Sequence, residues 1–338
     1  MKIIRRQTLT AGLAAALILL PALTIAQAAG LPTPGEVAKA LGFTDSEVAQ
    51  IQAGEIVSKD LNEGSDKELA GVVAVFFKKP VSELVEIALQ GKMLETDKNI
   101  RAFHVWKPDA SADEAFAGLK LDAAESDEAG IFSRASAGGK LNLSTAEIAQ
   151  FRKTKPEPAA VSAELRAMLK ARYDSYRKSG LSGIAPYARG GSKTATPGEE
   201  LVLAIKETMP AARRQDYFQA LLSYPAGPLP DVEHRFYWFK QEVEGRPTFI
   251  LAHRASRLTA NAALLTEEQY YVGHSYNSNF VTGGGLQVEG GTIVFYVNRT
   301  FTDQVAGFGS SVKHGIGRGR MLSEVAAKLK SIRDQLQK

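Results

Sequence analysis

An alternation of bulky and polar side chains in the last third of the chain constrains the fold more than any other feature. Residues 234–258 form two alternating runs around Glu244-Gly245, a pattern typical of a β-hairpin. Residues 267–281 and 290–301 predict two more strands, which a glycine-rich segment joins. Because side chains of a strand alternate between its faces, this region predicts an antiparallel sheet with its more apolar face on a core.

The segment after the last strand predicts a long amphipathic helix. Its apolar residues recur at three-four spacing, namely Phe308, Val312, Ile316, Val325, Leu329, Ile332 and Leu336. Glycines weaken the first half of this helix by roughly 1 kcal/mol each relative to alanine. Either these glycines permit close approach to another surface or a ligand, or the ordered helix starts only near Met321. Asp303 and Gln304 are expected to cap the helix.

Shorter elements occupy the rest of the chain. The pattern predicts helices over residues 34–42, 44–54 and 80–91, and strands over residues 54–61, 69–79 and 99–107. Between residues 108 and 232 the character changes to helix candidates punctuated by proline and glycine. The clearest of them, residues 158–180, carries an apolar stripe.

This order of elements resembles the START-like, helix-grip superfamily. The similarity covers residues 54–106 and 234–337: a strand ends at the proline that starts a helix, and antiparallel strands precede a long C-terminal helix. The resemblance implies an α+β fold, with an antiparallel sheet wrapped around the C-terminal helix and a cavity for a lipid or other hydrophobic ligand. Residues 108–232 then form a mostly helical insertion within a single domain, residues 29–338.

The first 28 residues predict a cleaved signal peptide. Positive charges at Lys2, Arg5 and Arg6 precede the apolar run 11–26, which is shorter than the roughly 20 residues of a membrane span. An A-x-A site at residues 26–28 would make Ala29 the mature start. A membrane anchor is the alternative. We expect a periplasmic or secreted protein that uses the general secretory route, with the twin-arginine route as the alternative because of the arginine pair.

Composition excludes several classes of protein. The formal net charge is +4, and the three charges that precede Ala29 leave +1 on the mature chain. A near-neutral chain lacks the concentrated basic surface that nucleic-acid binding requires. The chain has no cysteine, which excludes disulfides, thiolate metal sites and a lipid anchor on cysteine. No second long apolar run predicts a membrane span after signal cleavage.

The sequence carries no recognised catalytic, cofactor-binding or metal-binding motif, so we expect neither cofactor nor metal. Patterns for a nucleophile elbow, a phosphate-binding loop and a zinc-binding helix are missing. The five histidines are scattered along the chain. Hydrogen-bonded structural roles are favoured for His253 and His274, because no carboxylate at a fixed spacing accompanies either.

Polar and aromatic side chains on the strands supply candidate ligand contacts. In residues 290–301, Tyr296 and Asn298 share the face opposite the apolar one that includes Phe295. In residues 267–281 the pattern places Tyr271 on one face and His274 and Tyr276 on the other. We expect Tyr271 to line a cavity beneath the C-terminal helix together with Tyr296 and Asn298. The candidate cavity residues are Arg254, Tyr271, His274, Tyr276, Tyr296 and Asn298. A sheet with one solvated face is the alternative.

Three functions follow from these observations. The favoured one is an exported protein that binds a hydrophobic or lipid-like small molecule between the sheet and the C-terminal helix. The first alternative is an enzyme of cyclase or hydratase type, in which Arg254, His274 or Tyr276 would act as acid or base. The second is a non-catalytic scaffold that binds a partner protein through its helical insertion. The lack of a catalytic motif favours binding over catalysis.

Overall fold

The computed structural model describes residues 33–336 except residues 96, 213–214 and 308. The predicted signal peptide and Phe308 therefore lie outside the described residues. The strands are β1 (Val57–Asp60), β2 (Glu68–Phe77), β3 (Ile100–Trp106), β4 (Tyr187–Ala188), β5 (Thr194–Ala195), β6 (Glu233–Val243), β7 (Arg246–Leu258), β8 (Ala262–Val272), β9 (Ser278–Val288) and β10 (Gly291–Phe301).

Helices precede, interrupt and follow these strands. They are α1 (Pro34–Ala40), α2 (Asp45–Gln52), α3 (Val81–Leu89), α4 (Lys92–Glu95), α5 (Ala112–Phe116), α6 (Ser126–Ser133), α7 (Thr145–Phe151), α8 (Pro158–Ser179), α9 (Pro197–Ala212), α10 (Gln215–Ser223) and α11 (Ser310–Leu336), with a short 3₁₀ helix over Gly180–Gly183. None of the described helices is both long and apolar enough to cross a bilayer.

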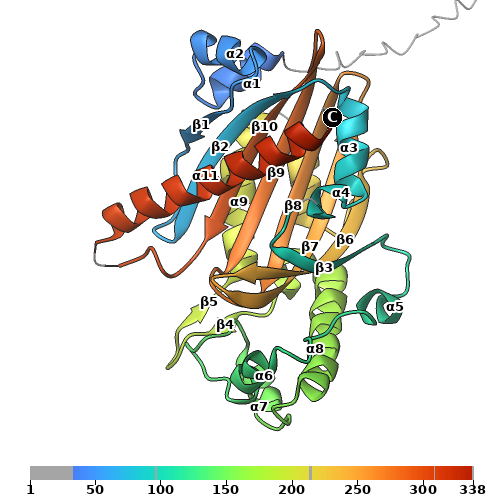
Figure 1. The fold of residues 1–338 in the computed structure, drawn as a ribbon, viewed down its shortest axis with the longest axis vertical. Coiled ribbons are helices and arrows are strands. Elements are labelled where there is room, and N and C mark those ends of the chain that lie inside the picture. The colour runs from blue at the N-terminus through green and yellow to red at the C-terminus, as the bar shows by residue number, and fades with distance from the viewer. Residues whose placement is uncertain (1–32, 96, 213–214, 308, 337–338) are drawn as a thin grey trace, which may run out of the picture. The chain divides into compact units, whose positions relative to one another are not determined.

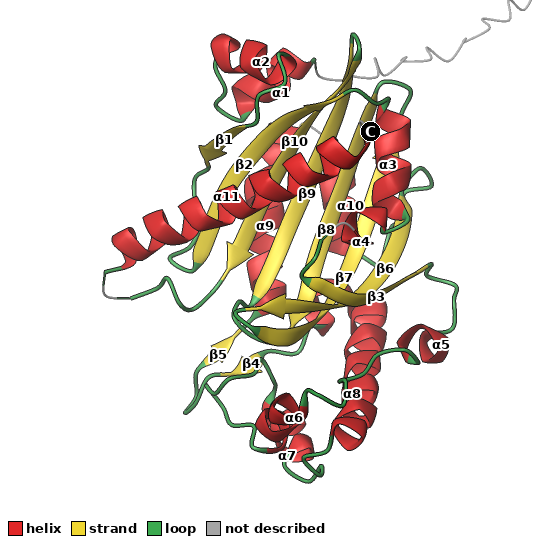
Figure 2. Ribbon diagram, in the orientation of Figure 1, coloured by secondary structure: helices red, strands yellow, loops and turns green. Residues whose placement is uncertain are grey.

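Eight antiparallel strands form the main sheet in the order β1-β2-β10-β9-β8-β7-β6-β3 (Figure 2). The predicted α+β class, with a large antiparallel sheet and a long C-terminal helix, is confirmed. The strands that the chain visits last, β6 to β10, are consecutive neighbours, so each pairs with the next as in a meander. Residues 107–232 separate β3 from its neighbour β6 and are mostly helical.

Helices cover both faces of this sheet (Figure 1). We call the face under α3, α4 and α11 the front face, and the face under α8 and α9 the back face. On the front face, Val73 and Val75 of β2 pack with Leu322 and Leu329 of α11. On the back face, Phe236, Leu251 and Tyr270 belong to a larger apolar cluster that includes Leu165 and Leu169 of α8.

The glycine-rich segment is a strand, and its expected role as a connection is wrong. Residues 278–288 form β9, while residues 273–277 make the turn that leads into it. A Cβ atom on Gly285 would lie 3.0 Å from Val81 Cγ2 of α3. Glycine is therefore the residue that lets α3 pack closely on the sheet at this point.

The C-terminal helix begins at Ser310, well before Met321, and residues of both its halves meet β2, such as Gly317 against Leu69 and Leu329 against Val73 and Val75. Leu329 and Ile332 are buried, whereas Val312 and Ile316 of the same predicted stripe are exposed by 65% and 69%. Figure 1 shows the first half of α11 extending past β1 at the sheet edge. The residue types are right for a helix, but nine residues, or two and a half turns, separate Ile316 from Val325, so the two side chains lie on opposite sides of α11. Val312 and Ile316 are therefore exposed because they point away from the sheet.

Candidate functional site

An ion pair between adjacent strands lies at the centre of the front face. Arg254 Nε of β7 donates to Glu267 Oε2 of β8 at 2.5 Å, and Gln269 Nε2 donates to the other carboxylate oxygen at 2.8 Å. Arg254 also donates to the carbonyl of Ala88 at 2.7 Å, near the C-terminus of α3, and its guanidinium lies 4.2 Å from the ring centroid of Tyr237. The pair is thus held between the sheet and α3.

These contacts keep both charges of the pair compensated although they are buried. Burial works against the charged guanidinium, but the Glu267 carboxylate outweighs it and raises the pKa of Arg254 above its ordinary value. The helix C-terminus at Ala88 adds a partial negative charge from unpaired carbonyls. A ligand that touched this part of the front face would therefore meet a neutral, hydrogen-bonded pair.

The aromatic neighbours of the pair follow the same face. The Tyr276 hydroxyl donates to Gln269 Oε1 at 2.8 Å, and the Tyr237 hydroxyl donates to the carbonyl of Leu89 at 2.7 Å. Tyr296 of β10 is half-buried, and its hydroxyl makes no hydrogen bond to any described residue. Burial raises the pKa of the Tyr296 hydroxyl above its ordinary value. A buried tyrosine hydroxyl usually has a hydrogen-bond partner, so this unpaired one can anchor a polar group of a ligand.

Three glycines show how closely the helices approach the front face. A Cβ atom on Gly71 of β2 would come within 2.6 Å of Leu322 of α11, and one on Gly285 would crowd α3. A Cβ atom on Gly283, which pairs with Tyr296, would meet only the carbonyl of Leu265 at 3.8 Å. The front face is therefore tightly covered on either side of Gly283 and open over Gly283 itself.

Half-buried side chains surround this opening. Leu265 of β8 and Val294 and Tyr296 of β10 keep part of their surface exposed, although α3 and α11 flank them. Asn298 is buried beyond Tyr296 and donates to Thr300 Oγ1 at 3.0 Å. We call the space over Gly283, with these residues around it, the front-face site. It combines an apolar floor with a few polar groups, as small-molecule sites do.

The structure brings four of the sequence-predicted candidates together on the front face, namely Arg254, Tyr276, Tyr296 and Asn298. His274 lies elsewhere, in a pocket at the end of the sheet. His274 and His253 are both hydrogen-bonded, the former to Thr248 and Ser275 and the latter to Tyr176 and His234.

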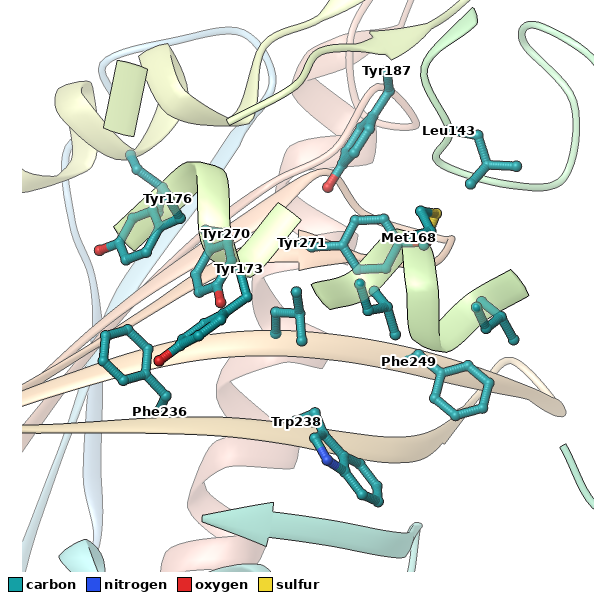
Figure 3. Close-up of a cluster of buried hydrophobic side chains, with 14 of the residues drawn as sticks. Leu143, Met168, Tyr173, Tyr176, Tyr187, Phe236, Trp238, Phe249, Tyr270 and Tyr271 are labelled. Carbon is teal, nitrogen blue, oxygen red and sulfur yellow. The ribbon is translucent and has the colours of Figure 1, made fainter. Parts of the chain in front are cut away.

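Tyr271 does not share a face with Tyr296, which corrects the expected placement. The pairing of β7 with β8 shifts between Leu251 and Ala252, so Tyr270 is an extra residue on β8. Tyr270 and Tyr271 therefore both point to the back face, where Tyr271 lies beside Tyr187 (Figure 3). The guanidinium of Arg172 lies 4.6 Å from the centroid of the Tyr271 ring. A bulge of one residue reverses the alternation beyond it, and the sequence pattern alone carries no mark of it.

Sequence reasoning missed three front-face residues, which are Glu267, Gln269 and Tyr237. Glu267 and Gln269 alternate correctly with Leu265 along β8, so the period of two could have placed them with the candidates. What the sequence could not show is that Glu267 lies directly opposite Arg254, because that pairing depends on the hairpin register.

The expected helix-capping role of Asp303 is also wrong. Asp303 lies before α11 and pairs with Arg189 Nε at 2.7 Å and with Lys67 Nζ at 2.8 Å. It lines the same pocket as His274, together with Thr302 and Gln304. The polar residues that follow β10 thus form the rim of a pocket and leave α11 uncapped by them.

Comparison of the chain with protein-family models, with curated proteins and with solved structures found no match. The function is therefore argued from the geometry of the described residues.

Proposed function

We propose that the protein is an exported carrier that binds a hydrophobic, lipid-like small molecule at the front-face site. The observation that carries the proposal is the opening over Gly283, where α3 and α11 flank half-buried apolar side chains and the unpaired hydroxyl of Tyr296. A soluble chain that leaves such a surface between two docked helices gains by covering it with an apolar ligand.

The strand order supports the helix-grip part of this proposal. The strands β2-β10-β9-β8-β7-β6-β3 place the first and last long strands side by side, and α11 crosses the same face as α3. In this interpretation residues 108–232 are a helical insertion that covers the back face. Export follows from the predicted signal peptide and makes the ligand one that is found outside the cytoplasm.

Two adjacent glycines provide a matched test. Gly283→Val would fill the opening on the front face, whereas a Cβ atom on Gly284, which points to the back face, meets nothing within 4 Å. We expect monoolein or another lipid from a broad panel to raise the melting temperature of the wild type and of Gly284→Val. Bound ligand stabilises by about 2.7 kcal/mol at a hundred times its dissociation constant.

The Gly283→Val variant should lose this stabilisation while its ligand-free melting temperature stays close to that of Gly284→Val. Native mass spectrometry of protein purified from its own compartment identifies the ligand directly. If no lipid stabilises the wild type and none is retained, the carrier function is wrong and a partner-binding role of residues 108–232 becomes the better hypothesis.

A further inference from the structure

A second concave site lies at the end of the sheet, away from the opening over Gly283. We call it the strand-end pocket; its volume is about 400 Å³, within the range of small-molecule sites. Its lining comes from residues 138–140 and 302–304 and from Asn142, Arg189, Glu244, Arg246, His274, Ser275 and Asn277. The lining therefore joins the segment between β3 and β6 to the ends of the sheet strands.

The base of the strand-end pocket is rigid because Arg189 is held on three sides. Its Nε donates to Asp303 at 2.7 Å, and its Nη2 donates to the side-chain oxygens of Asn142 and Asn277, at 2.8 Å each. Both asparagines are buried, and Asn142 donates in turn to two backbone carbonyls. A guanidinium fixed in this way loses little conformational freedom when a ligand binds.

The pocket keeps two positively charged donor groups that are not used by the described part of the protein itself. Arg189 Nη1 and the exposed ammonium of Lys140 make no hydrogen bond or ion pair to any described residue. Asp303 is shared between Arg189 and Lys67, so one carboxylate faces two cations. The remaining cation, Arg246, is neutralised by bonds of 2.8 and 3.0 Å to the buried Glu128 carboxylate. A carboxylate is the group that these open donors recognise.

The pocket also has one negatively charged hydrogen-bond acceptor with a free oxygen. Glu244, at the turn between β6 and β7, accepts from the Ser275 hydroxyl at 2.8 Å through Oε2, and its Oε1 has no partner among the described residues. His274 adds no charge near neutral pH, because burial and the nearby Arg246 lower its pKa to about 4. Behind Asn277, burial raises the pKa of Glu200, against the hydrogen bonds from Ser278 and Asn277 that lower it.

We propose that the strand-end pocket binds a small zwitterion of the α-amino-acid type. Its carboxylate binds Arg189 Nη1 and Lys140, and its ammonium binds Glu244 Oε1. A purely anionic ligand would leave Glu244 repelling it, and a purely cationic one would face the surplus of positive charge around Arg189. The volume leaves room for a side chain, at roughly 30 Å³ for each atom of the size of water. This site does not depend on the front-face site.

Isothermal titration of the full-length mature chain, first with the twenty proteinogenic amino acids, tests the proposal. The best binder is then compared with two analogues that lack its amino or its carboxyl group, for leucine 4-methylpentanoate and isopentylamine. We expect the amino acid to bind at least ten-fold more tightly than either analogue. An analogue that binds as tightly as the amino acid, or no binding of any amino acid at 10 mM, overturns the proposal.

Two exposed side chains make reciprocal variants that leave the fold intact. Lys140→Met should weaken the binding of the amino acid and of its carboxylate analogue at least five-fold and leave the affinity for the amine analogue unchanged. Glu244→Gln should weaken the binding of the amino acid and of the amine analogue and leave the affinity for the carboxylate analogue unchanged. Equal losses for all three ligands in either variant would contradict the assigned orientation. Unchanged affinity for the amino acid in both variants would place its binding outside the pocket.

Discussion

Tyr176 of α8 donates a hydrogen bond of 2.5 Å to Glu268 Oε2 of β8, and both side chains are almost completely buried. The Tyr176 hydroxyl also lies 2.7 Å from His253 Nδ1, and His253 Nε2 lies 2.9 Å from Nδ1 of the half-buried His234, where this series of hydrogen bonds ends. If each histidine carries its proton on Nδ1, every bond points inward to the carboxylate. This chain of hydrogen bonds fastens α8 to the back face, and it makes that contact sensitive to protonation.

The first prediction concerns the pH dependence of stability. Burial raises the pKa of Glu268 from its ordinary 4.5 to about 7, despite the opposing hydrogen bond from Tyr176. Between these values the folded chain keeps a proton that the unfolded chain releases, so stability falls as pH rises from about 4.5 to 7. This contribution should amount to about 3 kcal/mol and disappear in Glu268→Gln, measured by urea unfolding at several pH values.

Two comparisons isolate the Glu268 contribution. Burial, followed by His234, lowers the pKa of His253 well below its usual range, so His253 makes the protein less stable as pH falls below about 6.5. That effect has the opposite sign and remains in Glu268→Gln. Tyr176→Phe, which removes the hydrogen bond and keeps the ring stacked 4.2 Å from Tyr270, should extend the decline above pH 7. Parallel pH profiles of wild type and Glu268→Gln would contradict the assignment.

The second prediction concerns the ion pair on the front face. Glu267→Gln leaves the buried guanidinium of Arg254 without a counter-charge, and we expect the free energy of unfolding to fall by about 3 to 5 kcal/mol. The matched control is Glu83→Gln on α3, which breaks the partly exposed pair with Lys79 and should cost no more than about 0.5 kcal/mol. Similar unfolding midpoints for both variants in urea would show that the Arg254 charge is solvated.

The sequence predicted the helices and strands of this fold better than it predicted how the strands pair. A period of two placed Tyr296 and Asn298 on one face of β10, and the structure has them there because the strand is regular. The same rule misplaced Tyr271, since the bulge at Tyr270 depends on how β8 pairs with β7. Pairing register is set by long-range packing, so a pattern within one strand does not reveal it.

Glycines were the other source of error, for a physical reason. A run of glycines is typical of a loop, but Gly285 lies inside β9 because α3 packs where its side chain would be. Similarly, the pattern of α11 predicted one continuous docking stripe, although Ile316 lies two and a half turns before Val325 and so points away from the side of the helix that docks. The strand-end pocket was visible only as a polar cluster around Asp303, since Arg189 reaches it from far along the chain.

The third prediction uses two apolar residues of the C-terminal helix. Leu329→Ala removes a buried side chain that packs with β2, so we expect a loss of about 2 to 5 kcal/mol in the free energy of unfolding. Ile316→Ala removes a side chain of similar size from an exposed position of the same helix and should change stability by no more than about 0.5 kcal/mol. Comparable losses in the two variants would mean that Ile316 is buried as Leu329 is.

The fourth prediction compares two glycines with the same backbone φ of 57°. Alanine in this left-handed region costs roughly 1 to 2 kcal/mol, and Gly191, which has nothing within 4 Å of its Cβ position, should show only that cost. At Gly180, after α8, a Cβ atom would lie 1.9 Å from the carbonyl oxygen of Tyr224, so the backbone must move. Gly180→Ala should therefore cost at least a further 1 to 3 kcal/mol, roughly the penalty of overpacking.

Chemical unfolding of both variants measures the difference. Because the Tyr224 ring stacks on Tyr176 and lies 4.7 Å from the His253 ring, Gly180→Ala should also shift the pH profile assigned to Glu268, whereas Gly191→Ala should leave it unchanged. Equal stability of the two variants would show that the end of α8 is not fixed against Tyr224.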